Sequence, residues 1–319
     1  MFELLLAGVI GFLTAGLILF FIGYNPVEIY QIMFRYGFYK PDYLLSRSVA
    51  VMMAGLAFSI PALAGFFNIG GESQLYVGGF TCLITTYYTG NVFIGLITGF
   101  LAGGLYGLIL AVLRVYRGIN EVITAIMINW LTYYIILYLI LKYFLNPIQP
   151  HYSIQIPREI MLTPYTTFTL AVIACIIAYV IIYHTELGYT IRLSGLSFKS
   201  AVYAGLNPRK AILYSLFLGG GYAGLGGALH IAGLVSGFDT TMSAVYGLGF
   251  MGIGVGLMGR NNPLGIILAS IFYSGLVIGG QWVELKTGAP PYLADIIIGI
   301  VIIALSIPYA YRLIISYLT

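Results

Sequence analysis

Three polar side chains interrupt an apolar stretch at residues 65–74, which read GFFNIGGESQ. Asn68, Glu72 and Gln74 offer an amide, a carboxylate and a second amide within this short interval. Such groups bind sugar hydroxyls or base edges through paired donors and acceptors. We therefore predict that the three side chains line a cavity or a path for a polar solute. A short capped turn is the alternative interpretation.

The backbone around these residues must break a helix. Gly70 and Gly71 are adjacent, and each glycine costs about 1 kcal/mol in a helix interior. We expect one helix to stop before them and another to start there, with Glu72 and Ser73 in its first turn, where they satisfy free N–H groups. Irregular backbone at membrane depth persists when it is buried in protein or lines a cavity.

A second polar segment, YRGINEVITAIMINW at 116–130, opens a later helix. Asn120 and Glu121 can cap its first turn. At about 100° per residue, Thr124 and Asn129 fall within roughly a quarter turn of Glu121. A polar stripe of this kind inside a bilayer faces protein or water, so Asn129 is a further candidate for the path.

Composition indicates a polytopic, all-α membrane protein with a single domain, 1–319. The 319 residues are 60% hydrophobic and 8% charged, whereas soluble domains carry roughly a quarter charged residues. A span needs about 20 apolar residues, which predicts about ten transmembrane helices. They are expected at 3–23, 47–66, 72–89, 92–113, 121–141, 165–183, 211–232, 244–259, 263–280 and 292–311.

We expect a multi-pass protein of the cell membrane, in contact with its lipid. The distribution of basic residues predicts that both termini lie in the cytoplasm. This orientation places eight of the 14 Lys and Arg residues inside. The segments assigned to the outside contain acidic residues among their basic ones, so their net positive charge is smaller and a cytoplasmic location is less favoured for them. The eight inner residues are Arg114, Arg117, Arg192, Lys199, Arg209, Lys210, Arg260 and Arg312.

Enzyme chemistry finds no support in the sequence. It contains no G-x-x-x-x-G-K-[ST], no H-E-x-x-H and no G-x-S-x-G. We expect no catalytic residue, no metal site and no cofactor bound by this chain. The charges are scattered between apolar runs instead of forming a basic stripe, so nucleic acid is not an expected partner.

Two other segments have distinct patterns. The glycine-rich runs at 219–228 and 247–259 predict closely packed helices, and a partner chain of the same kind could share that surface. Residues 184–211, about the limits of a cytoplasmic loop, are too polar to span but contain a predicted short helix around Ser197–Ala204. Short helices that dock in grooves let one protein move another; a plain connecting loop is the alternative.

Together, four segments resemble a known family. They are FNIGGESQ at 67–74, GINEVITAIMIN at 118–129, Gly188–Gly205 and Gly247–Gly265. In order and in residue type they are similar to the permease subunits of ATP-binding-cassette importers of the branched-chain amino acid, ribose and nucleoside permease family. The resemblance is greatest to the branch that carries nucleosides and simple sugars.

The resemblance implies a ten-span permease that works with other subunits. These are a second permease, identical or different, an ATPase subunit that binds the ATP and Mg²⁺, and an extracytoplasmic substrate-binding protein. By position it assigns Asn68, Glu72 and Gln74 to the border of the substrate path. It also assigns a segment that couples to the ATPase, made of Gly188, Arg192, Gly195, Ala204 and Gly205.

Two other function classes stay open. An ion-coupled secondary transporter of a small polar solute needs intramembrane acids, for which Glu72, Glu121 and Asp295 are the candidates. A structural or receptor subunit is the other. ATP-dependent uptake that survives an ionophore would exclude the first, and copurification with an ATPase would argue against the second.

Overall fold

The computed structural model of the chain describes residues 2–242 and 245–306, almost all of them helical. In these ranges β-structure is limited to isolated bridges, Leu145 with Ser153 and Tyr152 with Asp239. The elements are α1 (Phe2–Ile22), α2 (Pro26–Gly37), α3 (Pro41–Leu63), α4 (Gly71–Thr89), α5 (Val92–Arg117), α6 (Glu121–Tyr143), η1 (Arg158–Ile160), α7 (Pro164–His184), α8 (Glu186–Leu196), α9 (Phe198–Tyr203), α10 (Pro208–His230), η2 (Ile231–Val235), α11 (Leu248–Met258), α12 (Pro263–Thr287) and α13 (Pro291–Ser306).

Six helices of the described residues, α3, α5, α6, α7, α10 and α12, are long and apolar enough to cross a membrane. The chain is therefore an all-α polytopic membrane protein, as predicted. Each of the ten expected spans coincides with a helix, but length and apolarity do not establish the count of ten. The apolar stretches in α1, α11 and α13 have 10–17 residues, fewer than the about 20 that a span needs. The first turns of α4 are polar.

The expected end of the last span, 307–311, and Arg312 lie outside the described residues.

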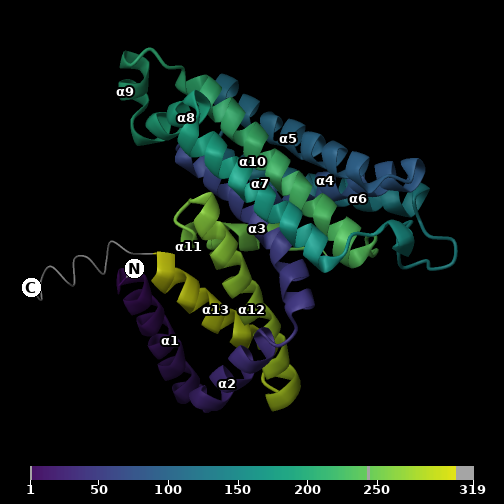
Figure 1. The fold of residues 1–319 in the computed structure, drawn as a ribbon, viewed down its shortest axis with the longest axis vertical. Coiled ribbons are helices and arrows are strands. Elements are labelled where there is room, and N and C mark those ends of the chain that lie inside the picture. The colour runs from purple at the N-terminus through teal and green to yellow at the C-terminus, as the bar shows by residue number, and fades with distance from the viewer. Residues whose placement is uncertain (1, 243–244, 307–319) are drawn as a thin grey trace, which may run out of the picture.

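Helix α3 is the central element of the fold. In Figure 1 the helices α4, α5, α6, α7 and α10 form one group, and α1, α2, α11, α12 and α13 form another beside it. Helix α3 packs on α7 and α10 of the first group and on α11 and α12 of the second. Its most apolar window is 83% buried inside the protein, so α3 holds the two groups together.

Glycines bring α5 and α10 together, as the glycine run of α10 predicts. A Cβ atom added at Gly103 would lie 2.4 Å from the carbonyl oxygen of Gly220, and one added at Gly224 would lie 2.2 Å from that of Gly99. Backbones can approach this closely only when the facing residues have no side chain. The contact fixes α5 and α4 against the α10 side of the bundle.

The segment at 184–211 is more helical than its sequence predicts. The expected short helix around Ser197–Ala204 is confirmed as α9, which begins after the N-cap Ser197. Helix α8 was not expected; it starts where the Thr185 side chain accepts the N–H of Gly188. Polar residues interrupt the apolar ones along this segment, so the sequence shows no apolar run there. Figure 1 places α8 and α9 at one end of the long helices.

Candidate functional site

The glycine pair separates two helices, as predicted. Helix α3 ends at Leu63 and α4 begins at Gly71. The chain between them turns back along α3, because the Asn68 Nδ2 donates a hydrogen bond to the carbonyl oxygen of Ala57 at 2.9 Å. Ala57 lies six residues before the end of α3, or about 9 Å along its axis. The break is therefore held alongside α3 and not beyond its end.

Asn68 and Gln74 stabilise this turn from within. Their side chains are 2% and 0% exposed. The Asn68 Nδ2 also donates to the Gln74 Oε1 at 3.2 Å, and its Oδ1 accepts the N–H of Gly70 at 2.9 Å. Neither residue lines the cavity described below. Their predicted role in the path is not tested by these contacts.

Asn129 of α6 binds the break from the other side. Its Oδ1 accepts the N–H of Ser73 at 3.1 Å, and its Nδ2 donates to the carbonyl oxygen of Ile69 at 3.0 Å. The first contact satisfies one of the N–H groups that the start of α4 leaves without a partner in the helix. Asn129 lies eight residues into α6, about 12 Å along a helix of about 34 Å. The break thus lies roughly a third of the way along α6.

Glu72 connects α4 to the start of α11. Its Oε1 accepts the N–H of Gly247 at 2.5 Å, its Oε2 accepts the N–H of Gly249 at 2.7 Å, and the Tyr76 hydroxyl donates to Oε1 at 2.5 Å. The sequence predicts correctly that Glu72 lies in the first turn of α4. Its carboxylate, however, serves the positive end of α11, a helix that begins far away in the sequence.

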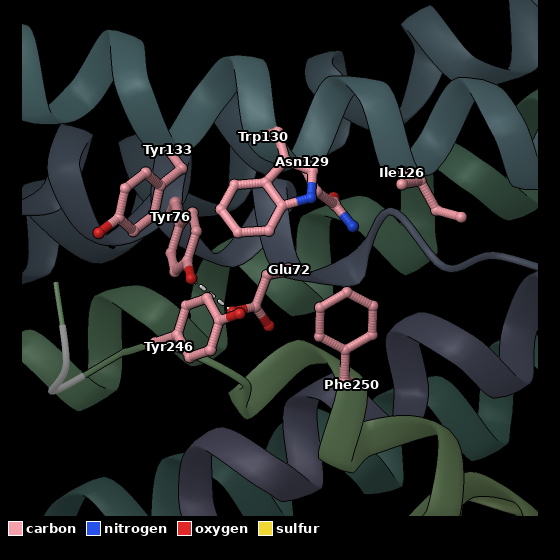
Figure 2. A pocket seen from close by; sticks show the side chains of 8 residues that line it. All are labelled: Glu72, Tyr76, Ile126, Asn129, Trp130, Tyr133, Tyr246 and Phe250. Carbon is pink, nitrogen blue, oxygen red and sulfur yellow. Dashed lines mark hydrogen bonds between the residues drawn. The ribbon is translucent and has the colours of Figure 1, made fainter.

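A cavity of about 130 Å³ opens beside these contacts. We call it the aromatic recess. Two of the four residues predicted for the substrate path, Glu72 and Asn129, line it. Figure 2 shows the Tyr76 hydroxyl directed at the Glu72 carboxylate, with Trp130 on one side of that carboxylate and Tyr246 and Phe250 on the other. The full lining is Glu72, Tyr76, Ile126, Asn129, Trp130, Tyr133, Tyr246 and Phe250.

Tyr76, next to the break, is a tyrosine that the sequence suggests could face a substrate, and it lines the recess. The other four aromatic members were missed. Tyr133 follows Asn129 at four residues and Trp130 at three, spacings that make it a neighbour of both on the surface of α6. Tyr246 and Phe250 are four residues apart at the start of the second glycine run. The α6 pair could have been found from its spacing to Asn129, whereas the α11 pair required the tertiary contact through Glu72.

The rest of the predicted polar stripe on α6 has another role. Asn120 caps the helix through bonds from the N–H groups of Val122 and Ile123, as the sequence indicates. Glu121 forms an ion pair with Arg114, with Oε2 and Nε 3.3 Å apart. Neither Glu121 nor Thr124 lines the aromatic recess. The stripe therefore divides into a capped, ion-paired end and a recess residue, Asn129.

Of the residues predicted for coupling, three lie on α8 and two directly follow the last residue of α9. Gly188 and Gly195 permit close approaches: an added Cβ would lie 2.2 Å from the carbonyl oxygen of Ile182 and 2.1 Å from that of Leu63, respectively. The guanidinium of Arg192 lies 4.9 Å from the centre of the Tyr183 ring. These contacts fix α8 against the ends of α7 and α3.

Ala204 and Gly205 end helix α9. The N–H of Gly205 bonds to the carbonyl oxygen of Val202 and that of Leu206 to Ala201, each at 3.0 Å. Gly205 has a φ of +77°, so this pair of bonds forms a Schellman motif with glycine at the left-handed position. Helix α9 is thus a short rigid unit with defined ends.

Comparison with known proteins identifies the chain. Residues 41–306 match the family described as "Branched-chain amino acid transport system / permease component". The chain belongs to this family. It is therefore a multi-pass membrane permease component of an ATP-binding-cassette system and not a catalytic enzyme.

The permease is similar to relatives over much of its length. It is 30% identical to the guanosine ABC transporter permease protein NupP of Bacillus subtilis, an alignment that covers 98% of this chain and 95% of that protein. The glucose ABC transporter permease protein TsgB13 of Haloferax volcanii is 29% identical, with 92% and 83% covered. A second B. subtilis guanosine permease protein, NupQ, is 25% identical, with 66% and 72% covered.

The α8–α9 end of the permease exposes large apolar side chains next to basic ones. Leu196 is 84% and Tyr203 is 91% exposed, and Phe198 and Val202 are about half exposed. Lys199, on the same short helix, is also exposed. An apolar patch rimmed by charge is a common feature of protein interaction sites.

Proposed function

We propose that this permease imports nucleosides or simple sugars and forms the membrane path for them. The observation that carries the proposal is similarity over nearly the whole chain to permease proteins named for guanosine and for glucose. ATP and Mg²⁺ are assigned to a separate ATPase subunit, because the sequence contains no phosphate-binding loop. An extracytoplasmic binding protein delivers the substrate.

The proposed arrangement in the membrane has ten spans and both termini in the cytoplasm. Helices α1, α4, α11 and α13 complete the six longer spans, since shorter helices can be accommodated by local thinning of the bilayer or by packing in a larger assembly. Arg114, Glu121, Arg209 and Phe198 line one common cavity at the α8–α9 end. Basic residues predicted to be inside thus gather at one end of the protein.

A second permease, identical or different, completes the transporter. Two similar guanosine permease proteins exist in B. subtilis, which supports a pair. The aromatic recess also supports it, because Trp130, Tyr246 and Phe250 remain partly exposed and a facing subunit would close the path. Glu72 and Asn129 border that path directly, while Asn68 and Gln74 hold the turn behind it.

Helix α9 transmits the movement of the ATPase. Its apolar patch docks in a groove of the ATPase, in the manner of helix-in-groove recognition. The tight contacts of Gly188 and Gly195 carry the displacement to α7 and α3, with Arg192 holding α8 on Tyr183. Ala204 and Gly205 fix the end of α9. The path then alternates between outward-open and inward-open states.

An ion-coupled transporter is less consistent with the contacts of two of the three candidate acids. Glu72 is held by two backbone N–H groups and a tyrosine hydroxyl, and Glu121 by Arg114. A carboxylate that serves as a helix cap has little freedom to bind and release a cation during a transport cycle.

Uptake by the reconstituted complex in liposomes tests the proposal. We expect labelled guanosine or glucose to accumulate only when ATP reaches the ATPase, and to do so in the presence of a sodium or proton ionophore. The permease without its partners should move no solute. Unaided movement by the isolated chain, or uptake that collapses with the ionophore, would contradict the assignment.

A further inference from the structure

Five aromatic side chains line the aromatic recess around Glu72: Tyr76, Trp130, Tyr133, Tyr246 and Phe250. The centre of the Trp130 indole lies 5.9 Å from that of the Tyr133 ring and 6.5 Å from that of Tyr246. Tyr133 and Tyr246 are 6.4 Å apart. Trp130 is nevertheless 48% exposed. Tyr134 stacks on the Trp130 indole, with ring centres 6.2 Å apart and 26° between the ring planes, and the indole also lines the recess.

Most polar groups of the recess already form hydrogen bonds. Glu72 accepts from Gly247, Gly249 and Tyr76. Asn129 accepts from Ser73 and donates to Ile69, and the Tyr133 hydroxyl donates to the carbonyl oxygen of Thr241. A further ligand therefore meets three groups that can still form hydrogen bonds: the second N–H of the Asn129 amide, the indole N–H of Trp130 and the hydroxyl of Tyr246.

We propose that the aromatic recess is a stacking subsite for a planar heteroaromatic base, with Trp130 as its main platform. The inference rests on the proposed function and narrows its substrate to nucleosides. The cavity of about 130 Å³ is smaller than the roughly 300–1,000 Å³ of a complete small-molecule site. It accommodates one ring system, and the ribose remains in the wider path outside.

The balance of ring faces and free polar groups discriminates between the two candidate substrates. A base presents an apolar π-face to Trp130 and needs few partners, and its edge can take the remaining N–H of Asn129. A simple sugar carries hydroxyls around its whole ring. The recess has fewer free polar groups than a sugar has hydroxyls, so some hydroxyls that enter lose their water without gaining a partner, and the sugar is disfavoured.

The tryptophan content of the chain allows a direct test. Only two tryptophans occur, Trp130 and Trp282. Trp282 is outside the recess, stacked on Tyr36 with ring centres 4.9 Å apart. In the full-length Trp282→Phe variant in lipid nanodiscs, Trp130 is the sole tryptophan emitter. Guanosine, uridine, ribose and glucose are titrated, and the Trp130→Phe variant, which keeps Trp282, corrects for absorption by the nucleosides.

We expect saturable quenching of Trp130 by both nucleosides, with an affinity at least about fivefold above that of ribose or glucose, which corresponds to the lower end of base–aromatic stacking. In the complete transporter, Trp130→Leu should raise the KM for nucleoside uptake by a similar factor, and Trp130→Phe should retain most of the affinity. Equal quenching by sugars, or no response to any probe, overturns the inference.

The liposome uptake assay described above, combined with the fluorescence titration, separates this inference from the proposed function. If nucleoside uptake depends on ATP but the fluorescence of Trp130 does not change, the stacking subsite is overturned and the import function stands. Saturable nucleoside quenching without ATP-dependent uptake supports the subsite and overturns the import function. Loss of both signals overturns both.

Discussion

At the scale of single residues, Glu72 has the largest structural consequences. It joins α4 to residues 175 and 177 positions later in the chain. Its carboxylate satisfies N–H groups at the start of α11, where the helix dipole also favours negative charge. The same oxygen atoms face the aromatic recess. One side chain thus fixes the geometry of the recess and contributes to its lining.

Replacement of Glu72 should lower stability in a graded way. Glu72→Ala leaves the N–H groups of Gly247 and Gly249 and the hydroxyl of Tyr76 without their partner, and each buried donor without a partner costs about 1–3 kcal/mol. Glu72→Gln keeps one acceptor oxygen and should cost less. Tyr76→Phe removes one donor and should cost least. Thermal unfolding of the purified variants measures the order, and a Glu72→Ala protein as stable as the wild type would contradict it.

Cysteine accessibility should separate the recess from the turn behind it. A cysteine at Ile126, which lines the recess and is about half exposed, should react with a water-soluble thiol reagent. A cysteine at Asn68 should not react in the same state, because that position is 2% exposed. The native Cys82 and Cys175 are both buried and free, so background labelling should be low. Equal reactivity at Ile126 and Asn68 would refute the placement.

At the scale of elements, α8 and α9 form the exposed end through which the ATPase is proposed to act. We expect Leu196→Ser or Tyr203→Ser to weaken copurification with the ATPase and to lower substrate-stimulated ATP hydrolysis. Thermal stability should remain within about 0.5 kcal/mol of the wild type, because both side chains are exposed. Leu285→Ser is the matched control, since Leu285 is 74% exposed near the end of α12. Equal loss in the control would argue against a specific contact.

The contact between α5 and α10 predicts a strong position effect for glycine. Gly103→Leu must displace the backbone of α10, because an added Cβ alone lies 2.4 Å from the Gly220 oxygen. Overpacking costs typically about 1–3 kcal/mol and more when it meets backbone. Gly299→Leu in α13 is the control, since no atom lies within 4 Å of its added Cβ. Size-exclusion profiles in detergent should show aggregation or loss of the Gly103 variant only.

The elements could be predicted where local sequence determines them. The length of the apolar runs predicts the long helices. The pair Gly70 and Gly71 predicts the break before α4, and the Asn120 cap predicts the start of α6. Helix α8 was not predicted because polar residues interrupt its apolar ones and leave no apolar run. The partner of Glu72 escaped for a different reason: its hydrogen bonds cross more than half of the chain, and no local pattern encodes them. The same tertiary contact brings Tyr246 and Phe250 to the recess.

At the scale of the whole molecule, α3 links the proposed sites. Its last residue, Leu63, contacts Gly195 of α8, and Ala57 holds the turn that carries Asn68. The break is therefore hydrogen-bonded to the same helix that α8 packs against. A displacement of α8 can therefore be transmitted through packed residues to the recess, and a displacement at the recess can be transmitted to α8 in the same way.

Such a connection must be reciprocal if it couples binding events. When trapped nucleotide changes the affinity of the recess for a nucleoside by some factor, saturating nucleoside must change the affinity for nucleotide by the same factor, typically about 5- to 150-fold. We expect equal factors in the complete transporter, with Trp130 fluorescence in the Trp282→Phe background as the nucleoside signal. Tyr203→Ser should bring both factors toward one together, because it weakens the contact at α9. Nucleotide trapping that leaves nucleoside affinity unchanged would show that the recess and the α8–α9 end are energetically independent, since a packed route transmits nothing unless the two states favour different arrangements along it.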